Sequence, residues 1–327
     1  MIAHEQHAIS GTGTRLDRHL LSTYPWLDRT TVQELIAAGA ITRNGSRSPK
    51  GAKLSAGDVL DCRDIPEPDD LRLRPNSDLP LNVLYEDAAL LALDKPAGQP
   101  THPLRATETD TLANALVARF PELASIGDDR LFPALLHRLD TQTSGLVLAA
   151  KTPAAYAALR AQFRRFTVKK HYTALVHGRV DSPGRLDAPL THQTRSPCTM
   201  AVVRHLDKVK ASDRFDAVTA WSPIQTGKEF SLLDVVIFTG VTHQIRCHLA
   251  AAGHPIAGDA LYGSAILPPV SSLQSPVSGL RPLPPRHWLH AARIILTHPA
   301  TAKSLDLACP LPPDWPPVRS CPIVRPS

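Results

Sequence analysis

Cysteine is scarce in this chain, and the few cysteines are scattered. The five stand far apart among 327 residues and include no CxxC pair: Cys62, Cys198, Cys247, Cys309 and Cys321. Neither a disulfide framework nor a structural zinc site is therefore indicated. With 43% hydrophobic residues, a chain of this length can bury a sizeable core without such crosslinks. We expect a protein of a reducing compartment that uses no metal and no cofactor.

Long apolar runs are also missing. The opening segment MIAHEQHAISGTGTR has no apolar signal core, and no run approaches the roughly 18 apolar residues of a membrane span. The formal net charge of +6 suits a polyanionic partner, although many basic proteins bind no nucleic acid. We expect a cytoplasmic monomer without a membrane partner, divided into one small and one large domain.

The small domain is expected over residues 14–63. Residues 1–13 are polar and contain glycine, so we expect a flexible tail there. The segments TRLDRHLLSTYP and DRTTVQELIAAG place apolar residues at helical spacing, and the second has Asp28 as N-cap and Gly39 after its end. Asn44-Gly45 then favours a tight hairpin turn. Residues 64–80 are rich in Pro and Asp, which indicates a linker.

The large domain is expected over residues 81–327, and its central stretch is LLHRLDTQTSGLVLAA. There His137, Arg138 and Asp140 stand before a Thr-Ser-Gly corner and a short apolar run typical of a buried strand. An aspartate in such a place usually caps a turn. Further on, residues 267–285 form a Pro/Ser-rich stretch that indicates a surface insertion.

Two further stretches carry polar residues in an ordered spacing. KKHYTALVHG contains Lys170 and Tyr172, and a lone tyrosine on a strand is usually a packing residue. VTHQIRCHLAAAGHPIAGDALYG reads as a helix with Thr242 as its N-cap, and the residues after this threonine include His243, Gln244 and Arg246.

Together these three stretches resemble the signatures of the RluA-type RNA pseudouridine synthases, HRLDxxTSG, KxYxAlvxG and GRTHQIRxHLxxxGxPixGDxxYG. The resemblance runs from about Arg15 to Pro299. It implies an α+β fold in which a mixed or antiparallel β-sheet builds the catalytic domain. Two departures stand out, because Asp94 occupies the usual position of Asn in NKPAG and Val241 the usual position of Arg.

The resemblance also implies roles for single residues. Asp140 is the implied nucleophile, although the sequence leaves open whether it attacks the ribose or abstracts a sugar proton. A buried carboxylate stays ionised only beside a cation, and Arg246 is expected to be that partner. Because a stacked uridine must be flipped out, Arg138 is expected to fill the gap. Further RNA contacts are expected from four residues around these motifs: His137, His243, Gln244 and Lys170.

Tyr172 is implied to stack against the flipped base and to pass on the proton that leaves carbon 5. A tyrosine is a weak base unless its neighbours lower its pKa. The sequence places Lys169 and Lys170 beside it, and we expect these cations and Arg246 to supply that field.

Residues 14–63 resemble the small alpha-L RNA-binding domain named after ribosomal protein S-four. Arg29, Arg43 and Arg47 are expected to face phosphates, where each neutralised charge adds to affinity through counterion release. One departure is the acidic Asp28 where the family commonly has Ser, which makes that helix start a poorer phosphate site. A domain of this kind at the N-terminus favours large-subunit ribosomal RNA over transfer RNA as the partner.

Two other functions remain open at this point. The side chains of His137, Asp140, His243 and Asp259 would suit a metal-dependent hydrolase, but their spacings match no metal motif. The chain could also be a non-catalytic RNA-binding or ribosome-assembly protein on the same fold. Retention of Asp140 with the tyrosine and arginine of the motifs argues against that second function, whereas the two departures argue for it.

Overall fold

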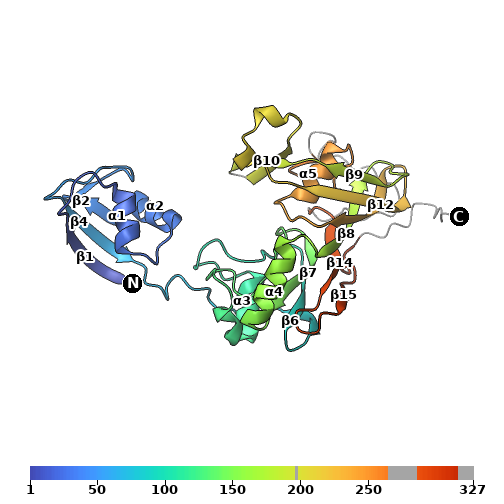
Figure 1. The fold of residues 1–327 in the computed structure, drawn as a ribbon, viewed down its shortest axis with the longest axis horizontal. Coiled ribbons are helices and arrows are strands. Elements are labelled where there is room, and N and C mark those ends of the chain that lie inside the picture. Colours follow the sequence, from blue (N-terminus) through green and yellow to red (C-terminus); the bar gives the residue numbers. More distant parts are fainter. Residues whose placement is uncertain (196–197, 264–285, 316–327) are drawn as a thin grey trace. The chain divides into compact units, whose positions relative to one another are not determined.

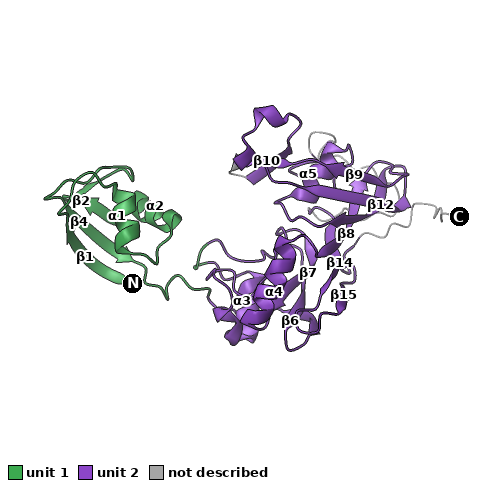
Figure 2. Ribbon diagram, in the orientation of Figure 1, with its two compact units in different colours: residues 1–73, 105–107 green, residues 74–104, 108–327 purple. Residues whose placement is uncertain are grey.

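The computed structural model of the protein describes residues 1–195, 198–263 and 286–315 (Figure 1). The chain forms two compact units, one of residues 1–73 with 105–107 and one of residues 74–104 with 108–327 (Figure 2). The first unit therefore runs ten residues past the boundary at 63 that the sequence indicated. The expected surface insertion at 267–285 lies outside the described residues.

The first unit packs two helices against a four-stranded sheet of order β1-β4-β2-β3. Leu16 and Leu20 of the first helix and Val32 of the second meet Leu60 of the sheet in one buried cluster. Asp28 caps the second helix as expected, because its carboxylate accepts the N–H of Thr31 at 2.7 Å. The elements are β1 (Ile2–Ala8), α1 (Leu16–Thr23), α2 (Arg29–Ala38), β2 (Ile41–Arg43), β3 (Ser46–Arg47) and β4 (Val59–Ile65).

The prediction of a flexible tail over residues 1–13 is wrong for residues 2–8. These form β1, which pairs antiparallel with β4 from Ile2 opposite Ile65 to Ala8 opposite Val59. The segment IAHEQHA has too few apolar side chains to show a strand period, and its backbone hydrogen bonds to β4 hold it in place. This edge strand therefore depends on pairing with a segment some 50 residues away.

The second unit is built on a nine-stranded sheet of order β5-β6-β7-β14-β8-β13-β12-β9, with β15 beside β14. The β7–β14 pair is parallel and the other named pairs of this sheet are antiparallel. This mixed sheet confirms the α+β fold that the sequence predicted. Its strands are β5 (Asn82–Glu86), β6 (Leu90–Lys95), β7 (Ser144–Ala150), β8 (Lys169–His177), β9 (Gly184–Asp187), β12 (Val218–Thr226), β13 (Phe230–Ile237), β14 (Leu289–Thr297) and β15 (Ser304–Ala308).

The second unit also contains a small hairpin, helices and short 3-10 turns. The hairpin β10 (Leu190–Arg195) and β11 (Cys198–Val202) stands apart from the large sheet in Figure 1. The helices are α3 (Leu112–Arg119), α4 (Pro153–Arg164) and α5 (Gln244–Ala251), with short 3-10 turns at Pro121–Ser125, Leu206–Lys208 and Ala211–Asp213. Thr152 caps α4, where its hydroxyl accepts the N–H of Ala155 at 3.1 Å. The described part of the chain contains no helix with the length and apolar character needed to cross a bilayer.

The expected cap of α5 is wrong. The residue before this helix is His243, which has a left-handed backbone with φ 55° and makes no side-chain cap bond. The Gln244 side chain instead accepts the N–H of Val241 at 3.2 Å, and the N–H of Gln244 donates to the Val241 carbonyl. The chain thus enters α5 through a tight turn that Gln244 closes, so Thr242 is not needed as a cap.

Strand β7 lies inside the sheet between β6 and β14, and its seven residues are all buried. It meets β14 where Gly145 pairs with Ala291. Gly145 has φ 109°, and a Cβ atom there would lie 2.3 Å from the carbonyl oxygen of Ala291. Only glycine fits this close parallel contact. The junction fixes the loop that leads into β7, and this loop carries the sequence HRLD.

Candidate active site

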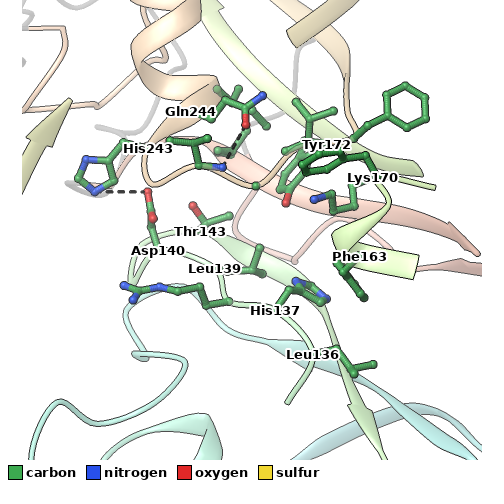
Figure 3. A pocket seen from close by; sticks show the side chains of 18 of the residues that line it. Leu136, His137, Leu139, Asp140, Thr143, Phe163, Lys170, Tyr172, His243 and Gln244 are labelled. Carbon is green, nitrogen blue, oxygen red and sulfur yellow. Dashed lines mark hydrogen bonds and ion pairs between the residues drawn. The ribbon is translucent and has the colours of Figure 1, made fainter. Parts of the chain in front are cut away.

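A cavity of about 500 Å³ opens beside the loop before β7 (Figure 3). A volume of this size lies within the roughly 300–1,000 Å³ of small-molecule sites. The three sequence motifs, which are separated by 24 or more residues, converge on it. Its walls include Leu136, His137, Arg138, Asp140, Thr143, Arg160, Phe163, Arg164, Phe166, Lys170, Tyr172, Phe238, Val241, His243, Gln244 and Arg246.

Arg246 joins two carboxylates at this cavity. Its Nη1 donates to Oδ2 of Asp140 at 2.8 Å. Its Nε and Nη2 donate to the two oxygens of Asp259 at 2.7 and 2.9 Å, which is a bidentate pair. Asp259 is held in turn by the N–H groups of Leu261 and Tyr262. The cation between the two carboxylates is therefore a guanidinium fixed in orientation before any substrate binds.

The electrostatics favour an ionised Asp140. Burial alone would raise the pKa of its carboxyl, but His243 and Arg246 outweigh burial and hold the pKa below its usual range. Arg246 stays charged, because Asp259 and Asp140 raise its pKa against the opposing effect of burial. Among the described residues, no group donates a hydrogen bond to Oδ1 of Asp140. At neutral pH the carboxylate of Asp140 is therefore ionised and lines the cavity with its Oδ1 free of hydrogen bonds from the described part of the chain.

His243 completes this side of the cavity. Its Nε2 lies 3.8 Å from Oδ2 of Asp140, a contact that Figure 3 marks with a dashed line, and its Nδ1 lies 3.0 Å from the hydroxyl of Tyr262. That hydroxyl also accepts the N–H of Met200 at 2.8 Å, and the guanidinium of Arg246 lies 5.2 Å from the Tyr262 ring centre. Burial lowers the pKa of His243. The histidine is neutral at pH 7 and acts as a hydrogen-bonding wall.

Tyr172 lines the same cavity from β8 with a side chain that is almost entirely buried. Burial raises the pKa of its hydroxyl, and the charge of Asp140 raises it further. The expectation that neighbouring cations lower this pKa is therefore wrong. Lys170 and Arg246 do line the cavity, but burial and the charge of Asp140 decide the direction of the shift. At neutral pH the hydroxyl keeps its proton.

Lys170 and His137 form the wall opposite Asp140. The ammonium group of Lys170 donates to the carbonyl of Thr239 at 2.6 Å and lies 5.7 Å from the ring centre of Phe163. Burial lowers its pKa to about 8. His137 stacks on the same Phe163 ring, with the two ring centres 5.2 Å apart, and accepts the N–H of Leu148. Burial lowers its pKa to about 3. His137 is thus a neutral packing residue.

Gln244 is turned into the protein, which contradicts its expected contact with RNA. Its amide oxygen accepts from Thr239 and from the N–H of Val241, and its amide nitrogen donates to Val218 and Thr219. Both ends of the side chain are engaged, so its role is to hold the turn before α5. Arg138, by contrast, is exposed at the cavity, as an RNA contact requires.

The loop carrying Asp140 is held by residues whose part the sequence did not reveal. Lys95 is fully buried and donates to the carbonyls of Pro96, Gln99 and Thr141 at 2.7–3.1 Å. Burial lowers its pKa to about 7. Thr101 binds the backbone of Leu139 from both sides, through the carbonyl at 2.7 Å and the N–H at 3.1 Å. These side chains fix the two residues that flank Asp140.

Two histidines near β14 hold the other end of this loop. His287 bonds to the hydroxyl of Thr143 at 2.7 Å, and His290 bonds to the hydroxyl of Ser144 at 2.9 Å. Burial lowers the pKa of His287 to about 4, so it is neutral. In the sequence, the Thr143-Ser144 pair ahead of β7 is the signal for these two contacts.

The two departures from the family pattern lie in different places. Val241 lines the cavity directly. Asp94 is not among the cavity's lining residues and accepts a hydrogen bond from the amide of Asn82 at 3.2 Å, within the β5–β6 pair. Only the valine therefore changes the chemistry of the cavity wall.

The three arginines of the first unit that were expected to bind phosphates differ in their hydrogen bonds within the protein. Arg29 is exposed at the first residue of α2. Arg43 donates to the carbonyl of Lys53 at 3.0 Å, and Arg47 donates to the carbonyl of Ala38 at 3.2 Å. The latter two thus brace their own unit, and each still leaves part of its guanidinium at the surface.

The proteins to which this chain is similar are described as RNA pseudouridine synthases. A family model described as RNA pseudouridylate synthase matches residues 89–251. The ribosomal large subunit pseudouridine synthase D of Zymomonas mobilis is 34% identical over 305 residues, which cover 92% of each chain. An uncharacterized RNA pseudouridine synthase of Chloroflexus aurantiacus is 38% identical over 313 residues, covering 93% of this chain and 88% of that one. The structure of human RNA pseudouridylate synthase domain containing 1 aligns with a TM-score of 0.54 at 25% identity, covering 73% of this chain and 87% of the human chain.

Proposed function

This chain belongs to the RNA pseudouridine synthase family, and from that premise we propose that it isomerises uridine in large-subunit ribosomal RNA with Asp140 as the catalytic carboxylate. The family and enzyme class expected from the sequence are thereby confirmed. The observation that carries the residue assignment is the ionised Asp140 held by Arg246 at the cavity. Ribosomal RNA is favoured because several relatives bear the name ribosomal large subunit pseudouridine synthase D.

The reaction breaks the bond from the ribose to the base nitrogen and remakes it to carbon 5 of the same base. Atoms are only rearranged, so no redox step and no energy input are needed. Asp140 can serve by attacking the ribose carbon or by removing a sugar proton, and both steps need the ionised form that Arg246 maintains. In either case Oδ2 stays on Arg246 while Oδ1 meets the sugar.

Tyr172 is proposed to hold the detached base while it rotates. The ring lines the cavity that contains Asp140, and its hydroxyl keeps its proton because burial raises the pKa. A protonated phenol can stack and donate a hydrogen bond but is a poor base. Asp140 is the only carboxylate among the described lining residues. We therefore assign removal of the carbon 5 proton to Asp140 after the new bond has formed.

Arg138 and the first unit are proposed to bind parts of the RNA other than the target uridine. Arg138 is exposed at the cavity and is placed to fill the gap that a flipped uridine leaves. In the first unit, the exposed Arg29 is the cation best placed for a phosphate, and Arg43 and Arg47 on β2 and β3 are further candidates. The resemblance of this unit to an alpha-L domain supports the proposal.

Asp140→Asn tests this function. The variant keeps the shape of the side chain but removes the negative charge, so we expect no isomerisation and RNA affinity within a few-fold of wild type. Pseudouridines should be mapped in ribosomal and transfer RNA of a deletion strain carrying either the wild-type or the Asp140→Asn gene. Restoration only in transfer RNA would overturn the ribosomal target, and equal restoration by both genes would overturn the role of Asp140.

A further inference from the structure

Two phenylalanines stand exposed at the cavity of the active site. Phe166 is 53% exposed and Phe238 is 44% exposed, and both line the cavity that contains Asp140. Single exposed apolar residues are common on protein surfaces and need no explanation. Two large exposed aromatic rings at the mouth of one cavity do need an explanation, because burying each ring would stabilise the fold.

The sheet brings these two residues to the same edge of the cavity. Strands β8 and β13 pair antiparallel, with Ile237 opposite Lys170 at one end. Phe238 directly follows Ile237, and Phe166 stands four residues before Lys170, in the turn between α4 and β8. The two rings therefore come from neighbouring segments, although 72 positions separate them in the sequence.

Phe166 also has an unfavourable backbone conformation. It follows the C-cap of α4 with φ 55°, and its N–H donates to the carbonyl of Phe163 at 3.2 Å. The position after a helix C-cap is typically glycine, because a side chain there is strained. A bulky residue in this region is a rare outlier. Exposure and strain both oppose stability, so folding gives no reason for a phenylalanine here, and such outliers gather at functional sites.

The charges around the rings match a nucleic acid strand. Arg164 is exposed and lines the same cavity, and Asp140 is the only carboxylate among the described residues of its wall. Val241 adds further apolar surface where the family usually has arginine. Flat apolar faces beside an exposed guanidinium suit a chain of bases joined by phosphates, since every base has a face that can stack on an aromatic ring.

We propose that Phe166 and Phe238 form an aromatic rim on which unpaired RNA bases next to the flipped uridine stack, with Arg164 on an adjoining phosphate. This inference rests on the proposed function, because it places the target uridine in the cavity. It adds a substrate class: a uridine whose neighbours are unpaired, as in a loop or bulge, because bases inside a regular helix cannot reach a side-chain face.

The test uses the full-length chain and a short single-stranded oligoribonucleotide with one central uridine and 2-aminopurine next to it. Stacking on an aromatic ring quenches 2-aminopurine fluorescence, so one titration gives both affinity and stacking. Phe166→Leu and Phe238→Leu keep an apolar side chain but lose the ring face. We expect each variant to bind the oligoribonucleotide about fivefold or more weakly, because about fivefold is the smallest loss of affinity expected when one base–aromatic stack is removed. Each variant should also lose the quenching of 2-aminopurine fluorescence. Phe166→Trp should restore both.

Phe215→Leu is the matched control, because Phe215 is a partly exposed phenylalanine of the same unit that does not line the cavity. It should bind like the wild type. Phe166→Gly supplies a second readout: it relieves the positive φ, so melting temperature should rise while affinity falls. A purely structural role for Phe166 would lower the two together and would overturn the proposal.

Other outcomes also decide. Wild-type affinity and quench in both leucine variants would refute the aromatic rim. Equal affinity for the oligoribonucleotide and for the same sequence in a duplex would refute the preference for unpaired neighbours. Tritium release from 5-tritiated ribosomal RNA distinguishes failure of the aromatic rim from failure of the proposed function. If the wild type releases tritium and the leucine variants show an unchanged KM, only the rim fails; if the wild type releases none, the proposed function fails.

Discussion

The contact between Arg246 and Asp140 makes a prediction about pH. Replacing Arg246 by Gln removes the cation that lies 2.8 Å from the Asp140 carboxylate and leaves only His243 and His287 to oppose the effect of burial on its pKa. An opposite charge at such a distance lowers a carboxyl pKa by about 1–3 units. Because activity needs the ionised form, the acid limb of kcat/KM should move up by about 1–3 pH units in Arg246→Gln, each unit being about 1.4 kcal/mol.

The sign of this shift follows from the two protonation states. In the wild type the pKa of Asp140 lies below its usual range, so the carboxylate is fully ionised at neutral pH and activity is lost only in acid. Without the guanidinium the same group is protonated at higher pH, and the loss of activity begins nearer neutrality. Part of the lost rate should therefore return when the pH is raised, which a purely steric defect would not allow.

Arg246→Lys is the matched control, since it keeps the positive charge but cannot form the bidentate pair with Asp259. Its acid limb should stay near that of the wild type even if the rate falls. The assay is single-turnover tritium release between about pH 5 and 9, with circular dichroism and RNA binding followed at each pH. A uniform loss of rate in Arg246→Gln with an unmoved acid limb would refute the electrostatic role.

Three further predictions concern other parts of the chain. Tyr172→Phe should retain more than about a tenth of the wild-type tritium-release rate, because the hydroxyl stays protonated; a loss of about 10²–10⁴ would show that it transfers a proton. Gly145→Ala should destabilise the protein by more than about 2 kcal/mol in urea unfolding, since its Cβ would lie 2.3 Å from Ala291; an unchanged midpoint would contradict this. Arg29→Gln should flatten the slope of log affinity against log salt by about 0.7–0.9, and an identical slope would show that Arg29 contacts no phosphate.

The sequence predicted which residues meet at the cavity better than it predicted their contacts and pKa values. The ion pair of Asp140 with Arg246 followed from matching two motifs, and the structure has it at 2.8 Å. Asp259 was considered only as a metal ligand, because its bidentate grip on Arg246 depends on how α5 and the loop after it pack. The direction of the Tyr172 pKa was wrong for a similar reason: neighbouring cations can be read from a sequence, whereas burial depends on the whole sheet.

The order of the strands explains why residues outside the motifs position the catalytic loop. In the sheet, β7 lies between β6 and β14, so the loop before β7 has the ends of both neighbours beside it. From the β6 side, Lys95 holds the carbonyl of Thr141, and from the β14 side His287 holds Thr143. Each contact joins segments more than 40 residues apart, which no local pattern encodes. Asp140 therefore faces the cavity in a fixed position because three separate segments converge on one strand, and a change in any of them should reach the carboxylate without touching the RNA.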